Sequence, residues 1–197
     1  MEKELKIRIH SKDDFFRLVK ELKGYQQSVK QTNWYWDTND FHLLAKEAIL
    51  RIREEEGRRI ITWKKGKSIE DGYFVSEEIE AEFPGELNNC KTGKVLDIRA
   101  LPKDIIENIQ KVIPEDSFNL YCIGYIETER RYYSLQGFKL EVDHIRYPDG
   151  YEDFELEVET EKLDELRNII IELLKSMKID YSYQTQTKFQ RFLKYLH

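Results

Sequence analysis

The sequence predicts an α+β fold in which antiparallel strands, each with one apolar and one charged face, pack against helices. Residues 2–10, EKELKIRIH, alternate charged and aliphatic side chains with the period of two that separates the faces of a strand. The same alternation returns in five later segments. Helical patterns with apolar stripes at residues 11–24 and 162–179 would cover the apolar side of the sheet.

Length and composition indicate one folded, acidic domain over residues 1–197, large enough for a sizeable core. The net charge of -6 argues against a general nucleic-acid binder, although it does not exclude a locally basic cavity. Cys90 and Cys122 form no CxxC motif, and no long apolar run indicates export or a membrane span. We therefore expect a cytoplasmic protein without nucleic-acid or membrane partners.

The first third of the chain predicts one helix and four strands. The helix at residues 11–24 has Ser11 as its N-cap and Gly24 as its end, and it follows the strand at residues 2–10. A strand begins near Gln31 and reaches a turn-rich segment at residues 37–40, after which residues 41–47 suggest a short helical turn. Residues 48–67 predict two strands joined by a tight turn at Glu56-Gly57.

The rest of the chain continues the alternation of strands and helices. Residues 73–83 predict a strand, and residues 86–114 predict a loop, a helix started by Pro102 and a second loop, which together would form a helical insert or lid. Strands follow at residues 120–135, 138–147 and 151–160, with turns at residues 136–137 and 148–150. The helix at residues 162–179 has Thr160 as its candidate N-cap, and a short helix is expected within residues 187–196.

The charged faces are sorted by sign, which is unusual for strands that only face water. A solvated face normally mixes both signs with neutral polar side chains, whereas here some strands are basic and others acidic. Like charges two residues apart repel unless a neighbouring strand, a metal ion or a polyanion lies between them. If the strands close into a barrel, the charged faces point inward and helices cover the apolar faces outside.

The two kinds of charged strand suit a metal and a polyphosphate. Carboxylates in Glu-x-Glu pairs are hard oxygen ligands for Mg²⁺ or Mn²⁺, while Arg-x-Arg pairs and lysines suit phosphate oxygens. Acidic strands opposite basic strands therefore predict a metal and polyphosphate site. The alternative is a barrel held together by ion pairs alone, in which burying so many charges would be costly.

These segments resemble the CYTH superfamily, also called triphosphate tunnel metalloenzymes. EKELK resembles its N-terminal ExExK motif, and LRIR, TWK, TERR, LEVDH and DFELEVE resemble later family strands in the family's order. TKFQRFL resembles the C-terminal lysine segment of a bacterial branch. The resemblance runs from Glu2 to Leu193 and implies an eight-stranded antiparallel closed barrel with a charged interior and helices packed outside.

The resemblance also implies roles for individual residues. The implied ligands of Mg²⁺ or Mn²⁺ are Glu2, Glu4, Asp143, Glu155 and Glu157. The implied phosphate-binding residues are Lys6, Arg51, Arg53, Lys64, Arg130 and Lys188, to which parity along the first strand adds Arg8. Glu78 and Glu80 would orient the basic residues, and the implied catalytic residues are Glu2, Glu4, Lys6 and Glu157. Two choices stay open: Arg130 or Arg131, and which pair among Glu155, Glu157 and Glu159.

The activity implied by the resemblance is metal-dependent hydrolysis of a small-molecule triphosphate with release of phosphate. Inorganic tripolyphosphate and thiamine triphosphate come before nucleoside triphosphates, because the sequence offers no clear base-recognition pocket. A class IV-type adenylyl cyclase is the second enzyme hypothesis, since the same site would activate a ribose hydroxyl instead of water. A non-catalytic polyphosphate- or nucleotide-binding module and a charged protein-binding sheet are further alternatives. We expect a monomer or homodimer.

Overall fold

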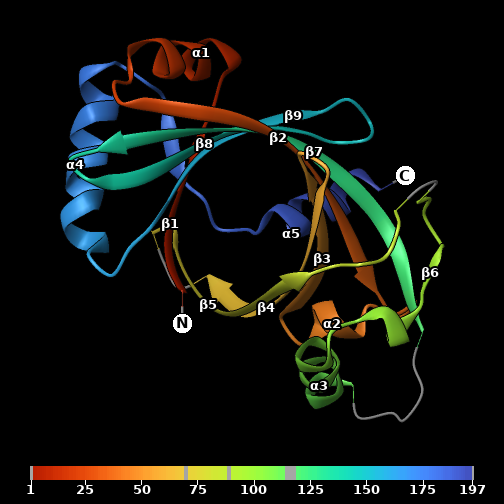
Figure 1. Ribbon diagram of the computed structural model, residues 1–197. Coiled ribbons are helices and arrows are strands. Elements are labelled where there is room, and N and C mark those ends of the chain that lie inside the picture. Colours follow the sequence, from red (N-terminus) through yellow and green to blue (C-terminus); the bar gives the residue numbers. More distant parts are fainter. Residues whose placement is uncertain (1, 69–70, 88–89, 114–118, 197) are drawn as a thin grey trace. The chain divides into compact units, whose positions relative to one another are not determined.

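The computed structural model describes residues 2–68, 71–87, 90–113 and 119–196 (Figure 1). The strands are β1 (Glu2–Ile9), β2 (Tyr25–Asp37), β3 (Ala48–Glu55), β4 (Arg58–Ser68), β5 (Tyr73–Glu82), β6 (Val95–Leu96), β7 (Leu120–Leu135), β8 (Phe138–Arg146), β9 (Glu152–Glu159) and β10 (Tyr181–Tyr183). The α-helices are α1 (Lys12–Glu21), α2 (His42–Ala45), α3 (Lys103–Val112), α4 (Leu163–Ser176) and α5 (Lys188–Phe192), and short 3₁₀ helices are η1 (Ile98–Ala100) and η2 (Leu193–Tyr195). None of these helices is long and apolar enough to cross a membrane.

The strand order closes on itself. From β1 the sheet runs through β5, β4, β3, β2, β7, β8 and β9, and β9 pairs antiparallel with β1. Strands β10 and β6 add to this ring at β1 and β7. The prediction of a closed eight-stranded antiparallel barrel is therefore confirmed.

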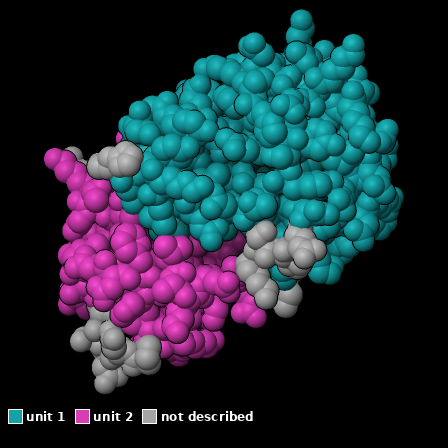
Figure 2. Space-filling model, turned by 180° about the vertical axis from the view of Figure 1, so that it is seen from behind, with its two compact units in different colours: residues 1–30, 68–75, 127–197 teal, residues 31–67, 76–126 magenta. Residues whose placement is uncertain are grey.

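The chain divides into two compact units, which Figure 2 colours separately. Unit 1 comprises residues 1–30, 68–75 and 127–197, and unit 2 comprises residues 31–67 and 76–126. Each unit has its own cluster of buried apolar side chains. That the chain acts as a single domain over residues 1–197 stays a prediction.

In unit 1, helices α1 and α4 cover the apolar face of the sheet (Figure 1). Alternate residues of β1, such as Leu5 and Ile7, are fully buried and belong to the same cluster as Phe15 of α1 and Ile170 of α4. Helix α1 begins where the sequence predicts, because the Ser11 hydroxyl accepts a hydrogen bond from the Asp14 N–H. The charged side chains of β1 consequently lie on the face opposite these helices.

In unit 2, helix α3 packs its apolar stripe on the strands β3 and β4. Ile105 and Ile109 are fully buried in one cluster with Leu50 and Ile61. The predicted insert at residues 86–114 thus contributes to the core of unit 2 and also contains β6 and η1. Residues 88–89 and 114 lie outside the described residues. A role of this segment as a lid stays a prediction.

The hairpin predictions are confirmed. Strand β7 has the predicted bounds, and the turns at Glu56-Gly57 and Gln136-Gly137 have positive φ at both residues, as a tight hairpin turn requires.

Several local predictions are wrong for identifiable reasons. Strand β2 begins at Tyr25, six residues before the predicted start at Gln31, because its first residues are exposed and lack the apolar alternation. Strands β6 and β10 are too short to leave a pattern. Helix α1 ends at Glu21, so Gly24 does not end it. At Gly24 a Cβ would lie 2.1 Å from the Ser134 carbonyl oxygen, and φ is +83°, so the glycine permits close contact with β7.

The predicted cap of the long C-terminal helix is also displaced. The Thr160 hydroxyl accepts a hydrogen bond from the Lys162 N–H, but Lys162 itself occupies the N-cap position of α4.

Candidate active site

Neighbouring strands of unit 1 align charged side chains in rows across the sheet. Arg8 of β1 lies opposite Glu155 of β9, which lies opposite Asp143 of β8, which lies opposite Arg130 of β7. Side chains directly opposite one another in a sheet share a face and are in contact range. The register therefore places two acidic residues side by side between two arginines.

A second row runs parallel to the first. Lys6 of β1 lies opposite Glu157 of β9, which lies opposite Glu141 of β8. The Lys6 ammonium is 2.6 Å from a carboxylate oxygen of Glu157 and 2.8 Å from one of Glu4. Lys6 thus joins Glu4 of the N-terminal acidic pair to Glu157 of β9.

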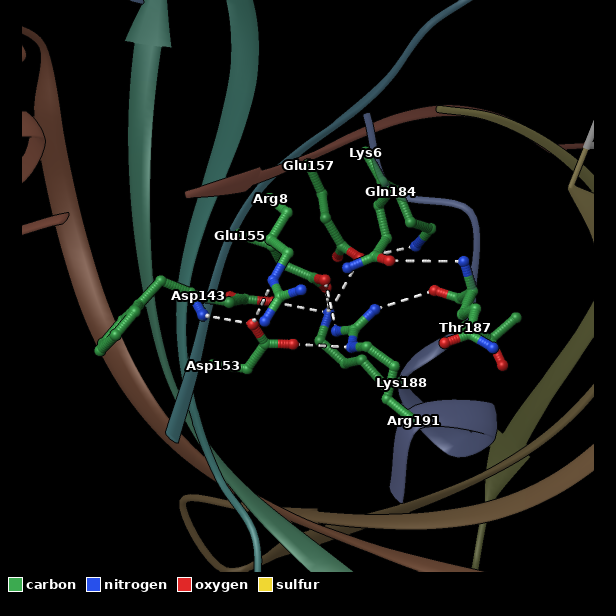
Figure 3. Close-up of polar contacts among 12 residues, drawn as sticks. Lys6, Arg8, Asp143, Asp153, Glu155, Glu157, Gln184, Thr187, Lys188 and Arg191 are labelled. Carbon is green, nitrogen blue, oxygen red and sulfur yellow. Dashed lines mark hydrogen bonds and ion pairs between the residues drawn. The ribbon is translucent and has the colours of Figure 1, made fainter. Parts of the chain in front are cut away.

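Three carboxylates of these rows form a compact buried group. Asp143, Glu155 and Glu157 each offer an oxygen within 4.8 Å of the others. Lys188 from α5 reaches into the group, with its ammonium 2.9 Å from Asp143 and 2.8 Å from Glu157 and in contact with Glu155 (Figure 3). We call Asp143, Glu155 and Glu157 the acidic group. Helix α5 therefore lies on the charged face of the unit 1 sheet.

Arg130 closes the other side of the acidic group. Its guanidinium donates two hydrogen bonds to the Asp143 carboxylate, at 2.8 and 2.6 Å, and one to Glu157 at 2.7 Å. It also forms an ion pair with Glu141. This planar, two-pronged contact is typical of arginine with oxyanions.

The electrostatic surroundings separate the pKa values of the acidic group. Burial disfavours the charged form of Glu157, but the attraction of three neighbouring cations outweighs burial and holds its pKa well below the usual value. Burial likewise opposes ionisation of Asp143, yet Arg130 and Lys188 lower its pKa. At Glu155 burial prevails over the attraction of Arg191 and Lys188, so its pKa is raised.

The acidic group has the chemistry of a divalent-cation site. Carboxylate oxygens are the ligands that Mg²⁺ and Mn²⁺ prefer, and three that converge in a buried place are enough when water fills the remaining positions. Two of the five predicted ligands, Glu2 and Glu4, lie outside this group. Glu4 is connected to it through Lys6, and Glu2 lies half-buried at the start of β1.

Geometry settles the two choices that the sequence left open. Arg130 faces the acidic group, whereas the guanidinium of Arg131 lies 5.5 Å from the ring centre of Phe15, on the helix-covered side. Glu155 and Glu157 are buried, whereas Glu159 is exposed. The inward-facing acidic pair of β9 is thus Glu155 and Glu157.

Arg191 is a functional candidate that the sequence analysis missed. Its buried guanidinium lies 2.5 Å from Glu155 and 2.8 Å from Asp153, which is buried as well. Two signals point to these residues: Arg191 follows Lys188 by three positions on a helix, and Asp153 precedes Glu155 by two on a strand. Arg8 lies with this pair, 3.2 Å from Asp153, rather than with the acidic group.

Unit 2 holds a second set of predicted residues. The Lys64 ammonium is 2.8 Å from Glu78, and Arg51 lies 3.7 Å from Glu78 and 3.5 Å from Glu80. Thr62, which the sequence analysis did not select, donates a hydrogen bond to Glu80 at 2.9 Å and accepts one from Arg51 at 3.1 Å. Glu78 and Glu80 therefore contact the basic residues of β3 and β4.

Arg53 contacts a neutral side chain of β2. Its guanidinium donates a hydrogen bond to the Asn33 side chain of β2 at 3.2 Å, and Asn33 is buried. Alternation on β3 puts Arg53 on the same face as Arg51.

Comparison with known proteins matches nearly the whole chain to one family. A family model described as the CYTH domain matches residues 1–193. A Bacillus subtilis (strain 168) protein named "Putative triphosphatase YjbK" is 24% identical over 185 residues, which covers 92% of this chain and 89% of that protein.

Solved structures share the fold. HpAC1 from Hippeastrum, described as a "putative adenylyl cyclase" with dominant triphosphatase activity, superposes with a TM-score of 0.84 at 23% identity and covers 100% of this chain and 97% of its own. A "putative adenylate cyclase" from Bacillus halodurans has a TM-score of 0.69 at 26% identity, with 98% and 99% covered.

Proposed function

Because this chain belongs to the CYTH domain family, we propose that it is a divalent-metal-dependent triphosphatase that hydrolyses a small triphosphate and releases phosphate. The observation that carries the proposal is the buried acidic group with Lys6, Arg130 and Lys188 around it. A site that only held an anion would gain nothing from three buried carboxylates. The description of YjbK as a triphosphatase supports the same activity.

The residues of unit 1 are proposed to have separate roles in binding the cation and the substrate. Asp143, Glu155 and Glu157 would hold Mg²⁺ or Mn²⁺, with Glu2 and Glu4 as further acidic residues on β1. The bound cation would neutralise charge on the phosphate oxygens. Lys6 would act twice, since it positions Glu157 and offers its ammonium to the substrate.

Basic residues would fix the phosphate chain. Arg130 and Lys188 present fully charged groups at the acidic group, because the neighbouring carboxylates outweigh burial and raise the pKa of both. The basic residues of unit 2 that are proposed to bind phosphate oxygens are Arg51, Arg53 and Lys64. Glu78 and Glu80 would orient Arg51, and Glu78 would also orient Lys64. Such positioning is the main work that a protein does in phosphoryl transfer.

The proposed substrates are inorganic tripolyphosphate and thiamine triphosphate ahead of ATP. Phosphate release is measured from each compound with Mg²⁺, with Mn²⁺ and with EDTA, for the wild type and for Glu157→Gln. We expect metal-dependent release that falls by a factor of about 10² or more in the variant, since a ligand is lost.

Glu159→Gln is the matched control for this assay. It removes the same charge from the same strand two residues away, at an exposed position, and should keep wild-type activity. Equal activity of Glu157→Gln and the wild type would contradict the role of the acidic group. Absence of release from every substrate would contradict the triphosphatase itself.

A second candidate is an adenylyl cyclase, which the description of the Bacillus halodurans structure favours. In that reaction the ribose 3′-hydroxyl of ATP, instead of water, would attack the α-phosphorus at the same cation site, and pyrophosphate would leave. The cyclase hypothesis would replace the triphosphatase hypothesis if ATP gives cyclic AMP and none of the three substrates releases orthophosphate.

A further inference from the structure

The two cysteines of the chain, Cys90 and Cys122, meet inside unit 2. Their sulfur atoms lie 3.4 Å apart, and both are free thiols. Cys122 belongs to β7 and is 1% exposed, whereas Cys90 precedes β6 and is 8% exposed. The two residues are 32 positions apart in the sequence, so the fold brings them together.

Backbone hydrogen bonds hold the two cysteines opposite each other. The Gly93 N–H donates to the Cys122 carbonyl oxygen at 2.7 Å, and the Cys122 N–H donates to the Lys94 carbonyl oxygen at 2.8 Å. Strand β6 continues this pairing with β7 (Figure 1). The Cys90 N–H donates to the Leu87 carbonyl oxygen at 2.8 Å. A disulfide has a sulfur–sulfur distance of about 2.0 Å, so the two sulfurs need to approach each other by only about 1.4 Å.

The surroundings of the two thiols are apolar. Both cysteines belong to the buried cluster of unit 2, together with Leu96 and Leu120. Burial raises the pKa of both thiols, that of Cys122 to about 12, although the charge of Lys94 opposes the shift. Since the thiolate is the reactive form, we expect slow reactions at neutral pH and faster ones at higher pH.

Packing alone is a sufficient reason for one buried cysteine, because cysteine behaves as a small apolar residue. It gives no reason for the only two cysteines among 197 residues to lie in contact with each other. Two neighbouring thiols can share one oxidation, and this is the chemistry that a single cysteine lacks.

We propose that Cys90 and Cys122 are a modification site, at which a small peroxide such as hydrogen peroxide forms a reversible intramolecular disulfide. Cys90 reacts first, because it is the more exposed thiol. Its sulfur forms a bond to one peroxide oxygen while the O–O bond breaks, which gives a sulfenic acid and one water. The Cys122 thiol then attacks this sulfur, the S–S bond forms, the S–O bond breaks and a second water leaves. The two thiols lose two electrons in total, and the peroxide gains them.

The disulfide would close a covalent loop around most of the predicted insert. The segment between the two cysteines contains β6, η1 and α3, and Ile105 and Ile109 of α3 are fully buried in the core of unit 2. A cross-link of this kind restricts the unfolded chain and therefore stabilises the folded one. The step uses neither the cation nor the phosphate chain of the proposed function and does not depend on it.

The test is a count of free thiols after the folded protein has been treated with hydrogen peroxide at mildly alkaline pH. The remaining thiols are alkylated in denaturant, and the mass is measured. We expect the wild type to lose both thiols and the mass of two hydrogen atoms, and to yield one cross-linked peptide that contains Cys90 and Cys122. Dithiothreitol should restore both thiols. The oxidised protein should unfold about 5 °C or more above the reduced protein.

Cys90→Ala and Cys122→Ala are the matched variants, since each keeps one thiol and prevents the disulfide. Peroxide should raise the unfolding temperature of neither. In Cys122→Ala the sulfenic acid of Cys90 should accumulate, and dimedone should trap it. In Cys90→Ala the more deeply buried Cys122 should react more slowly.

Two free thiols in the treated wild type would overturn the proposal. So would a disulfide between two chains, or oxygen added to each sulfur without a cross-link. An oxidised protein that unfolds no higher than the reduced one would refute the effect on the insert. Thermal unfolding in reducing buffer identifies a misfolded variant, and the peptide map of the wild type then decides.

Discussion

At the scale of single residues, the Lys188 ammonium offsets part of the negative charge of the acidic group. Burial alone would favour its neutral form, but Asp143, Glu155 and Glu157 outweigh burial and raise its pKa, so it stays an ammonium. Its position among three carboxylates resembles that of a cation they could bind. Without Lys188, the carboxylates would repel one another in a buried place.

We expect Lys188→Met to lower the free energy of unfolding by about 3–5 kcal/mol, as for a buried ion pair that loses one partner. Mn²⁺ should raise the unfolding temperature of this variant more than that of the wild type. The reason is that the ion would replace the positive charge that the acidic group loses with Lys188. Urea unfolding and thermal scans with and without Mn²⁺ measure both effects. Lys175→Met is the control and should change stability by no more than about 0.5 kcal/mol. A Lys188→Met variant as stable as the wild type would disprove this account.

Glu152 makes stability depend on pH. Its carboxylate accepts a hydrogen bond from Lys12 at 2.6 Å and contacts His144 at 2.8 Å. The hydrogen bond from Lys12 is the main cause that lowers the pKa of Glu152 from 4.5 to about 2. A carboxyl with a lowered pKa contributes stability above its unfolded value, and the contribution disappears as the pH falls toward the folded value.

Glu152→Gln should therefore be less stable than the wild type at pH 7, and the difference should shrink as the pH falls from about 4.5 toward 2. Urea unfolding of both proteins across this range measures it. Glu172→Gln, at an exposed position of α4, should match the wild type throughout. A difference between Glu152→Gln and the wild type that stays constant with pH would show that the charge is not the cause.

At the scale of elements, α5 is a short helix with a large effect on the site. It carries Lys188 and Arg191 and is held at its start by a capping box. The Thr187 hydroxyl accepts from the Gln190 N–H at 3.1 Å, and the Gln190 side chain accepts from the Thr187 N–H at 2.9 Å. Five residues are too few for a helix to be stable alone, so the cap and the ion pairs maintain it.

Thr187→Ala should destabilise the protein by about 0.5–2 kcal/mol, the usual cost of a lost N-cap. Thr187→Ser keeps the hydroxyl and should retain most of the stability. Chemical unfolding of the three proteins compares them. If the serine variant is as unstable as the alanine variant, the methyl group rather than the cap is responsible.

At the scale of the whole molecule, parity along the strands predicted most of the charged faces. Because side chains alternate, knowing that Leu5 and Ile7 are buried places Glu4 and Lys6 together on the other face. The order of basic and acidic strands then led to the family, which the match over residues 1–193 confirms. The charged faces of β1, β3, β8 and β9 were thus readable from alternation, whereas the closed eight-stranded barrel was implied by the resemblance to the family.

Features that depend on contacts between distant segments were not readable. Strand β10 forms because the Gln184 N–H and neighbouring groups find partners on β1, and three residues carry no periodic pattern. Gly24 is needed where Ser134 approaches, which no local sequence signal reveals. The buried partnership of Arg191 with Asp153 joins a helix and a strand that are separated by α4 in the chain.

The pairing of β1 with β9 also affects how the protein is made. Strand β1 leaves the ribosome before its partner β9, and seven other strands are synthesised between them. Contacts so distant along the chain are the slow kind to form. Until then Leu5, Ile7 and Ile9 lack the apolar residues of β9 and α4 in their cluster, and an edge strand with an exposed aliphatic face promotes association between nascent chains. The charges of Glu2, Glu4, Lys6 and Arg8 on its other face oppose that association, so the same residues that are proposed to serve the site protect the unfinished chain.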